Sequence, residues 1–421
     1  MPANLGAARK GQTDLDAAPA SFSADAQPRY ATANVVRLAI AQALAGANST
    51  VTYATGAVVG NTLSPHSALA TLPISIFVVG MAVCTLPAGA LARRYGRRAA
   101  FLTGTACGVV SGLLSALALV LGWFWLYCAA TFFGGVYAAV VLSFRFAAAD
   151  CVTADRRPRA LSAVMAGGVF AGVIGPQLVT YTMDLWLPPM FVVTFIAQAA
   201  VAALCGIVLL GVRLPAPTAE EVAGGRPLGE IVRQARFIIA VICGVVSYLV
   251  MNFLMTAAPL AMRLCSLPQE AANLGLQWHV IAMYAPSFFT GRLITRFGAS
   301  RIVAAGLALL AASGVAGLMG QEVGHFWGSL ILLGLGWNFS FVGASAMVLE
   351  CHRPEEKTRV QSLNDFIVFG LMAVGSFASG GLLTAFGWGT VLWVSFVPVA
   401  LAVTALMAVV LVGSAQERRS Q

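Results

Sequence analysis

The stretch Gly89-Ala-Leu-Ala-Arg-Arg-Tyr-Gly-Arg-Arg98 indicates the architecture of this chain, because it follows a long apolar segment and the pattern of its first eight residues is repeated further on. The repeat is Gly291-Arg-Leu-Ile-Thr-Arg-Phe-Gly298, which also follows an apolar segment. Both Gly89–Gly96 and Gly291–Gly298 begin and end with glycine and carry arginine two residues before the second glycine. The repetition predicts a chain built from two similar halves.

A second echo supports this division. Asp150-Cys151 precedes Arg159 by the same interval that separates Glu350-Cys351 from Arg359, and Ser162 and Ser362 follow in register. Between the halves lies segment 213–236, which is rich in proline and glycine. Secondary transporters commonly consist of such repeats, with a substrate site between them near the middle of the membrane.

The composition excludes an ordinary soluble domain. Apolar residues make up 59% of the chain, charged residues 10%, and the mean hydropathy is +0.84, whereas soluble domains carry about 25% charged residues. A membrane helix needs about 20 mostly apolar residues. The sequence therefore predicts an all-α membrane protein with twelve transmembrane helices in two six-helix halves. The predicted spans are 34–59, 67–91, 99–120, 122–148, 161–183, 187–212, 237–262, 275–295, 301–320, 326–349, 361–383 and 388–412.

The same pattern divides the chain into five parts. They are a disordered cytoplasmic tail (1–33), an N-terminal bundle (34–212), a cytoplasmic linker (213–236), a C-terminal bundle (237–412) and a short cytoplasmic tail (413–421). The first part is polar, rich in alanine and without an apolar core, so it does not read as a signal peptide.

The positive charge indicates the orientation of the chain. Of the 25 Lys and Arg residues, all but Arg145 and Arg263 lie in the tails or in loops on one side of the predicted spans. Loops that keep Lys and Arg stay in the cytoplasm, so both termini are predicted to be cytoplasmic. The net charge of +9 thus reflects membrane topology, and no nucleic-acid partner is expected.

The loop Gly89-x-Leu91-Ala92-x-Arg94-x-Gly96-Arg97-Arg98 resembles the signature loop of the major facilitator superfamily, and the resemblance covers residues 34–412. In that family an acidic residue of this loop helps to close a cytoplasmic gate against helix 11, but here Arg93 and Thr295 stand in its place. Asp365, at the start of helix 11, either supplies the missing carboxylate or is a surface acid favoured at a helix N-terminus. The predicted gate residues are Gly89, Arg93, Arg94, Gly96, Arg97, Asp365, Gly291, Arg296 and Gly298.

Few ionisable residues fall inside the predicted spans. Arg145 lies about one turn from a cytoplasmic end, where its long side chain is expected to reach the interface. Asp184 and Asp365 are placed at helix ends, and no Asp or Glu is placed in the middle of a span. Because intramembrane ionisable residues are usually functional, this scarcity argues against a proton-coupled drug or sugar carrier.

Two side-chain pairs suggest a metal site. Met251 and Met255 stand four positions apart on helix 7, as His279 and Met283 do on helix 8, so each pair shares a helix face. Met255 and Met283 lie roughly 10 and 12 Å below the outer helix ends. Thioethers and imidazole suit a soft cation such as Cu(I). The alternative is that methionine fills gaps in an apolar core and the histidine is a hydrogen-bonded interior residue.

The MxxxM and HxxxM pairs resemble those of the CcoA-like copper importers of bacterial inner membranes. That resemblance implies a monomeric secondary transporter that imports copper, as Cu(I) or a copper–ligand complex, for assembly of haem–copper oxidases. Copper would be the transported substrate, and no resident cofactor is expected. The partners would be copper and the lipid bilayer. Cys243 and Cys265 flank the predicted site and either relay copper or respond to redox state. The alternative is that Cys243 is a packing residue and Cys265 a free outer thiol.

Two other functions remain open. A proton-linked exporter of drugs or small metabolites is suggested by Gly172-Val-Ile-Gly175-Pro176, which partly resembles an antiporter motif, although GxxxG spacing also serves helix packing. A non-transporting receptor has no evident need for a duplicated gate. An enzyme is not expected, because catalytic groupings and nucleotide fingerprints are missing. In the first half, Asn48, Tyr53 and Gln177 either face the cavity or pair with backbone.

Overall fold

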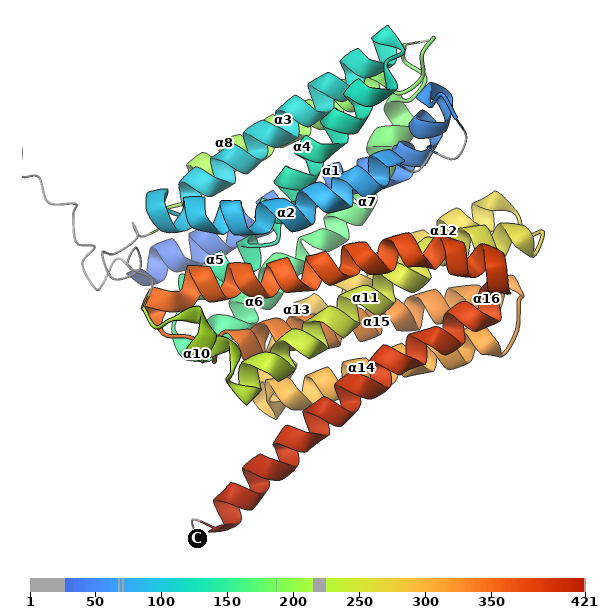
Figure 1. The fold of residues 1–421 in the computed structure, drawn as a ribbon. Coiled ribbons are helices and arrows are strands. Elements are labelled where there is room, and N and C mark those ends of the chain that lie inside the picture. The colour runs from blue at the N-terminus through green and yellow to red at the C-terminus, as the bar shows by residue number, and fades with distance from the viewer. Residues whose placement is uncertain (1–26, 67–68, 70–71, 187, 215–224, 420–421) are drawn as a thin grey trace, which may run out of the picture.

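The structure, a computed structural model, describes residues 27–66, 69, 72–186, 188–214 and 225–419. Within these ranges the chain forms helices and their connections, without strands. The N-terminal half occupies the upper part of Figure 1 and the C-terminal half the lower part. The predicted all-α membrane fold is confirmed.

The N-terminal half holds the first six spans. Spans four and five each consist of two consecutive helices, because the chain breaks at Leu142-Ser143 and at Gly167. The elements are α1 (Gln27–Leu63), α2 (Leu72–Tyr95), α3 (Arg97–Leu121), α4 (Phe124–Val141), α5 (Phe144–Asp150), η2 (Ala154–Arg156), α6 (Arg157–Ala166), α7 (Gly168–Thr182) and α8 (Val192–Leu210).

The C-terminal half repeats this plan. Its last two spans are two helices that meet at the non-helical Gly387, where φ is 80°, and they share the label α16. The elements are α10 (Leu228–Val232), α11 (Ala235–Leu264), α12 (Gln269–Tyr284), α13 (Ser287–Phe297), α14 (Ala299–Leu318), α15 (Val323–Val348), η3 (Pro354–Glu356) and α16 (Lys357–Arg419).

Nine helical segments of the described residues are long and apolar enough to cross a membrane. The three remaining predicted spans correspond to α1, to α12 with α13, and to the first part of α16. The first of these carries the polar run Asn48-Ser-Thr-Val-Thr-Tyr53, and the second is interrupted at Ala285-Pro286. In these two, the polar or interrupted sequence lowers the mean hydropathy.

The helix ends differ from the predicted part boundaries. Residues 27–33 belong to α1, although the tail was predicted to extend to 33, and 1–26 lie outside the described residues. The predicted linker contains α10 and the start of α11, with 215–224 outside the described residues. Helix α16 continues to Arg419, beyond 412, and 420–421 are again outside. A helix can extend past the bilayer, whereas hydropathy reports only where the apolar environment ends.

The repeated glycine loops adopt the same backbone conformation. Gly96 follows α2 and has φ 86°, while Gly298 follows α13 and has φ 87°. Side chains disfavour positive φ, so glycine is the residue that makes these turns without strain. The repeated sequence therefore has the same backbone conformation at both of its final glycines.

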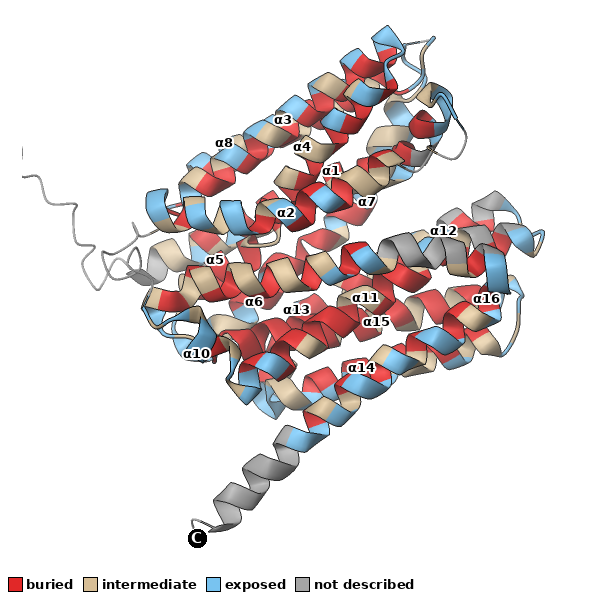
Figure 2. Ribbon diagram, in the orientation of Figure 1, coloured by how far each residue is buried: buried red, intermediate tan, exposed pale blue. Residues whose placement is uncertain are grey.

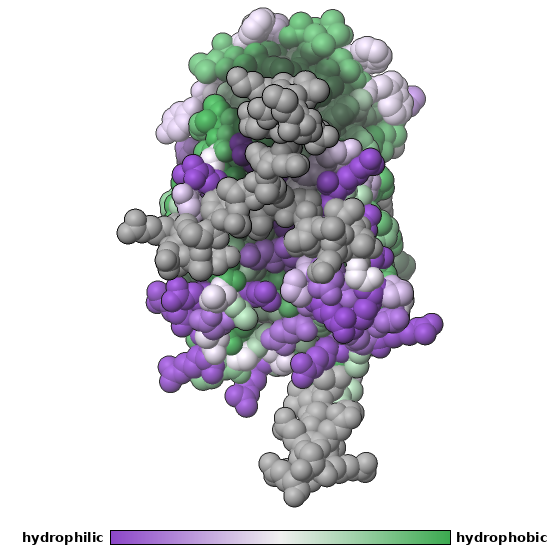
Figure 3. Space-filling model, turned by 90° about the vertical axis from the view of Figure 1, so that its left-hand side faces the viewer, coloured by the Kyte–Doolittle hydropathy of each residue, from purple (hydrophilic) through white to green (hydrophobic). Residues whose placement is uncertain are grey.

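The outer faces of the bundle are apolar. Exposed residues lie mainly on the outward sides of the helices and buried ones between them (Figure 2). Large exposed apolar side chains include Val83, Leu113, Val120, Trp125, Ile207, Val397 and Leu401. Apolar surface of this extent faces lipid. Hydrophilic residues gather instead at one end, on the left of Figure 1 and facing the viewer in Figure 3. We call this end, which carries the α2–α3, α5–α6 and α15–α16 connections, the basic side.

Candidate functional site

A buried ion pair joins the two halves near the basic side. The Nη2 atom of Arg145, in α5, lies 2.5 Å from Oδ1 of Asp365, in α16, and both side chains are at most 4% exposed. Arg145 also donates to the Leu142 carbonyl. Its guanidinium lies 4.3 Å from the ring centroid of Phe146 and 4.8 Å from that of Phe341.

This pair changes two sequence-based interpretations. Arg145 was expected to reach the membrane interface, but its charge is instead neutralised inside the protein by Asp365. The interpretation of Asp365 as a surface acid does not fit, because its carboxylate is buried and also accepts a hydrogen bond from Asn364 (3.0 Å). A buried charge is tolerated where it has a partner and further hydrogen bonds.

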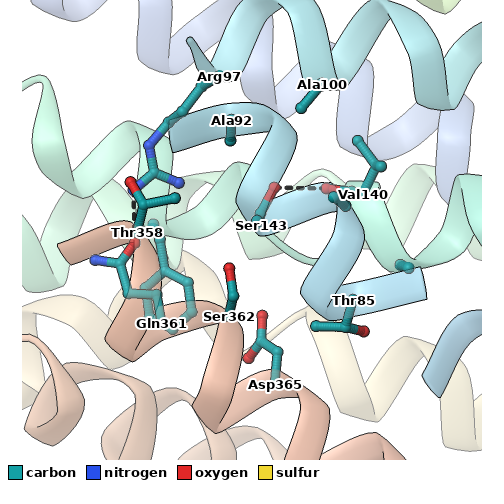
Figure 4. A pocket seen from close by; sticks show the side chains of 14 residues that line it. Thr85, Ala92, Arg97, Ala100, Val140, Ser143, Thr358, Gln361, Ser362 and Asp365 are labelled. Carbon is teal, nitrogen blue, oxygen red and sulfur yellow. Dashed lines mark hydrogen bonds between the residues drawn. The ribbon is translucent and has the colours of Figure 1, made fainter. Parts of the chain in front are cut away.

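A second polar contact between the halves starts from the repeated loop. Nη2 of Arg97, at the start of α3, lies 2.6 Å from Asp150 Oδ2 and 2.6 Å from Gln361 Oε1. Asp150 ends α5, whereas Gln361 belongs to α16 of the other half. The contact therefore ties α3 and α5 to α16. Figure 4 shows Arg97 and Gln361 turned toward each other beside a small pocket, into which Ser362 and Asp365 also point.

The two echoed glycines make matching contacts. A Cβ atom built on Gly89 of α2 would lie 2.5 Å from Cβ of Ser362 in α16. One built on Gly291 of α13 would lie 2.8 Å from Cβ of Ser162 in α6 and 2.6 Å from the Pro158 carbonyl oxygen. The amide of Gly291 donates to Ser162 Oγ (3.0 Å), which donates to the Ser287 carbonyl. Each repeated glycine thus allows close approach to the echoed serine of the other half.

The remaining predicted gate residues lie away from this contact. Arg94 and Arg296 are exposed and lie over the rings of their neighbours Tyr95 and Phe297. Arg93 is half-buried. Gly96 and Gly298 shape the turns described above. Of the predicted set, the structure places Gly89, Arg97, Asp365 and Gly291 where the halves meet.

The sequence analysis missed Arg145, Asp150 and Gln361 as members of this contact. Arg145 carried a usable signal, because it was one of two basic residues outside the loops and tails. Asp150 belonged to the second echo. Gln361 had no local signal, since its partner Arg97 is 264 positions away.

A further contact fastens the described end of the linker to η3. The Arg226 side chain binds Glu356 through Nε (2.6 Å) and Nη2 (2.8 Å), and the Arg226 amide adds a third bond (3.1 Å). Glu356 also accepts from the Arg353 amide (2.9 Å). Hydrogen bonds from Arg226 lower the pKa of the Glu356 carboxyl from 4.5 to about 2.

This shift predicts a pH-dependent stabilisation by Glu356. A carboxyl with a lowered folded-state pKa stabilises the fold above its unfolded pKa, and the contribution disappears as pH falls from about 4.5 to about 2. Glu356→Gln should therefore lower the unfolding temperature at pH 7, with a smaller difference at pH 3. Thermal unfolding of the wild type and of Glu356→Gln at pH 7 and pH 3 measures this difference in unfolding temperature. An equal difference at the two pH values would contradict the stabilising role of the ionised Glu356 carboxylate.

The residues predicted to bind metal lie in the C-terminal half. Met251 and Met283 are buried in its apolar core, and Met255 is half-buried against it. His279 is fully buried, and its Nδ1 atom lies 2.7 Å from the Leu330 carbonyl oxygen of α15. These placements match the packing alternative, in which methionine fills a core and the histidine is a hydrogen-bonded interior residue.

The two cysteines singled out with them lie apart. Cys243 is fully buried in α11 and its carbonyl accepts a hydrogen bond from Ser247. Cys265, beyond the end of α11, is half-buried and its Sγ atom lies 3.5 Å from Gln321 Oε1. Both are free thiols.

The three polar residues of the first half have different surroundings. Asn48 donates to the Leu44 carbonyl, and its own carbonyl accepts from Gln198 within the same half. Gln177 is exposed. Tyr53 packs edge-on against Phe77, with ring centroids 5.4 Å apart, and lies against a hydrophobic cluster that includes residues of the C-terminal half. Of the three, Tyr53 is the one that faces across the interface.

Two similar helical halves, held together on one side by polar and glycine contacts, are the architecture of secondary transporters. The chain belongs to the Major Facilitator Superfamily, whose family model matches residues 38–276 and again 240–421. The resemblance noted from the repeated loop is confirmed at this level.

The chain is similar to characterised and uncharacterised transporters. It is 47% identical over 377 residues to the riboflavin transporter RfnT of Brucella anthropi, covering 89% of this chain and 95% of the relative. It is 28% identical over 362 residues to YdeG of Bacillus subtilis, described as an uncharacterized MFS-type transporter, covering 82% and 84%.

Solved structures share the fold. The transporter FucP in its outward conformation superposes with a TM-score of 0.70 at 14% identity, covering 89% of this chain and 97% of that one. A bacterial homologue of the iron transporter ferroportin, in an outward-facing state, gives 0.68 at 14% identity, with 89% and 98% covered. At this identity the likeness concerns the fold alone.

The prediction of copper import is wrong, and so are the CcoA-like assignment and the copper partner. The relative that shares 47% of its residues over nearly its whole length is a riboflavin transporter. Spacing of four shows that two side chains share a helix face, but a core-facing methionine pair has the same spacing as a ligand pair. The comparisons favour the small-metabolite part of the alternative prediction.

Proposed function

We propose that this protein is a secondary transporter of riboflavin or a closely related flavin. The observation that carries the proposal is the 47% identity to a riboflavin transporter, which spans both halves and 95% of that relative. The match extends over both bundles, and in such transporters the substrate path lies between them. Transport alone is proposed, without catalysis and without a resident cofactor.

We further propose that the basic side faces the cytoplasm of a bacterial inner membrane, with both termini inside, because basic loops are retained there. The contacts of Arg97, Arg145, Gly89 and Gly291 then close the cytoplasmic end of the path. The described conformation is accordingly closed to the cytoplasm. Release of flavin on that side requires Arg145 to part from Asp365 and Arg97 from Gln361, while the two halves rock about the substrate.

Counterflow in liposomes tests the function without assuming a direction or a driving force. Purified protein is reconstituted with a high internal concentration of unlabelled riboflavin, and labelled riboflavin is added outside. We expect transient accumulation of label that excess external riboflavin abolishes and that protein-free liposomes lack. Folded, reconstituted protein that shows no exchange would refute the proposal.

A further inference from the structure

A cluster of aromatic rings fills the middle of the C-terminal half. Tyr248 of α11 makes edge-to-face contacts with Trp337, Phe341 and Phe369, at centroid distances of 5.5, 5.1 and 5.0 Å. Tyr284 of α12 contacts Trp337 in the same way at 5.6 Å. The tryptophan and both phenylalanines are at most 1% exposed, whereas the two tyrosines are only half-buried. The tyrosines therefore form the accessible edge of the cluster.

That edge is shared with the N-terminal half. Tyr53 of α1 is also half-buried and packs against the same buried hydrophobic cluster as Tyr248 and Tyr284. The Tyr284 ring also touches α7, because a Cβ atom on Gly168 would lie 2.6 Å from its Cε1 atom. Three phenol groups from three helices thus converge where the two halves meet.

Unused hydrogen-bond donors accompany these rings. Asn252 lies one turn from Tyr248 on the same face of α11 and is 4% exposed, yet its side-chain nitrogen has no hydrogen-bond partner among the described residues. The buried indole nitrogen of Trp337 also has no hydrogen-bond partner among the described residues. Buried donors normally have partners, so unpaired ones beside an accessible aromatic edge indicate a ligand with acceptor atoms.

The cluster is also connected to the ion pair between the halves. Phe341 stacks on Trp337, with centroids 5.1 Å apart, and lies on the other side against the Arg145 guanidinium. The same Phe341 ring contacts Tyr248, with centroids 5.1 Å apart. A ligand held by the tyrosines would therefore lie directly beside the residues that join the halves.

We propose that Tyr53, Tyr248, Tyr284 and Asn252 bind the fused heteroaromatic ring of the substrate. The inference rests on the proposed flavin transport and identifies the site. The isoalloxazine ring of a flavin is flat, is large enough to contact several aromatic side chains and carries carbonyl acceptors for the asparagine amide. Packing alone accounts for the buried rings of Trp337 and Phe341, but it leaves the Asn252 side-chain nitrogen and the Trp337 indole nitrogen unpaired.

Flavin fluorescence provides a direct test, because stacking on tyrosine or tryptophan quenches it. Riboflavin is titrated with purified wild-type protein and with Tyr248→Leu and Asn252→Leu, which keep apolar bulk. We expect quenching by the wild type and an affinity about tenfold weaker in each variant, as for the loss of one good stacking or hydrogen-bonding contact. Tyr181→Leu is the matched control, because Tyr181 is 74% exposed, and it should bind as the wild type does.

Lumiflavin, which has the same ring but no ribityl chain, separates the parts of the ligand. Tyr248→Leu should weaken riboflavin and lumiflavin by the same factor; a loss confined to riboflavin would overturn the assignment to the ring. Should Tyr248→Leu fail to fold, Tyr53→Leu in the other half provides the same comparison. Wild-type affinity in every variant would refute this site and leave flavin transport standing, whereas absence of binding to the wild type would refute both.

Discussion

Asp365→Ala is expected to abolish transport and to destabilise the protein strongly. The substitution leaves the Arg145 guanidinium, 1% exposed, without its counter-charge. Removing one partner of a buried ion pair costs about 3–5 kcal/mol, because the other charge stays desolvated. Counterflow rate and unfolding temperature in detergent measure the two effects. Asp155→Ala is the matched control, since the Asp155–Arg156 pair is 3.9 Å apart and over 70% exposed, and exposed pairs contribute little.

A double variant separates the stability effect from the effect on transport. Arg145→Leu combined with Asp365→Leu removes both charges, and such apolar replacements are often neutral or stabilising. We expect the unfolding temperature to return toward the wild-type value while transport stays impaired, because the reversible contact between the halves is missing. Wild-type transport in Asp365→Ala, or full activity in the double variant, would show that the pair has no part in the transport cycle.

Gly89→Ala is expected to slow transport at least tenfold without unfolding the protein. The added Cβ would lie 2.5 Å from Ser362 Cβ, so the halves could not close fully at the basic side. Alanine favours helix over glycine by about 1 kcal/mol, so the helix itself is not weakened. Gly370→Ala in α16 is the control, because a Cβ there meets no atom within 4 Å.

Rescue identifies the cause of that loss. Ser362→Gly removes the clashing atoms, so the Gly89→Ala/Ser362→Gly protein should recover transport. Gly291→Ala should be at least as damaging and should resist rescue by side-chain changes, because its Cβ would meet the Pro158 carbonyl oxygen and the Arg159 Cα atom. Counterflow rates of the wild type, Gly89→Ala, Gly89→Ala/Ser362→Gly and Gly291→Ala measure the loss and the rescue. A Gly89→Ala protein as slow as expected but unaffected by Ser362→Gly would place the defect elsewhere.

The sequence analysis failed where function depended on how helix faces pack. Met251 and Met255 do share a face of α11, as their spacing predicts. The spacing does not show which other helices and side chains pack against that face. Met251 is buried in an apolar core, and His279 is turned toward the Leu330 carbonyl of α15. A metal site was inferred from a pattern that core packing also produces. The 47% identity to a riboflavin transporter overturned the copper assignment.

The membrane fold, the two halves and the repeated glycine loops could be predicted from the amino-acid sequence. These features follow from local requirements, since a bilayer demands an apolar run for each span and a positive φ favours glycine at each turn. The pairing of Arg145 with Asp365, 220 positions away, and the packing of tyrosines from both halves against one buried cluster are visible only in the folded molecule. Such contacts depend on which helix faces meet when the halves pack, and no local pattern in the chain records that choice.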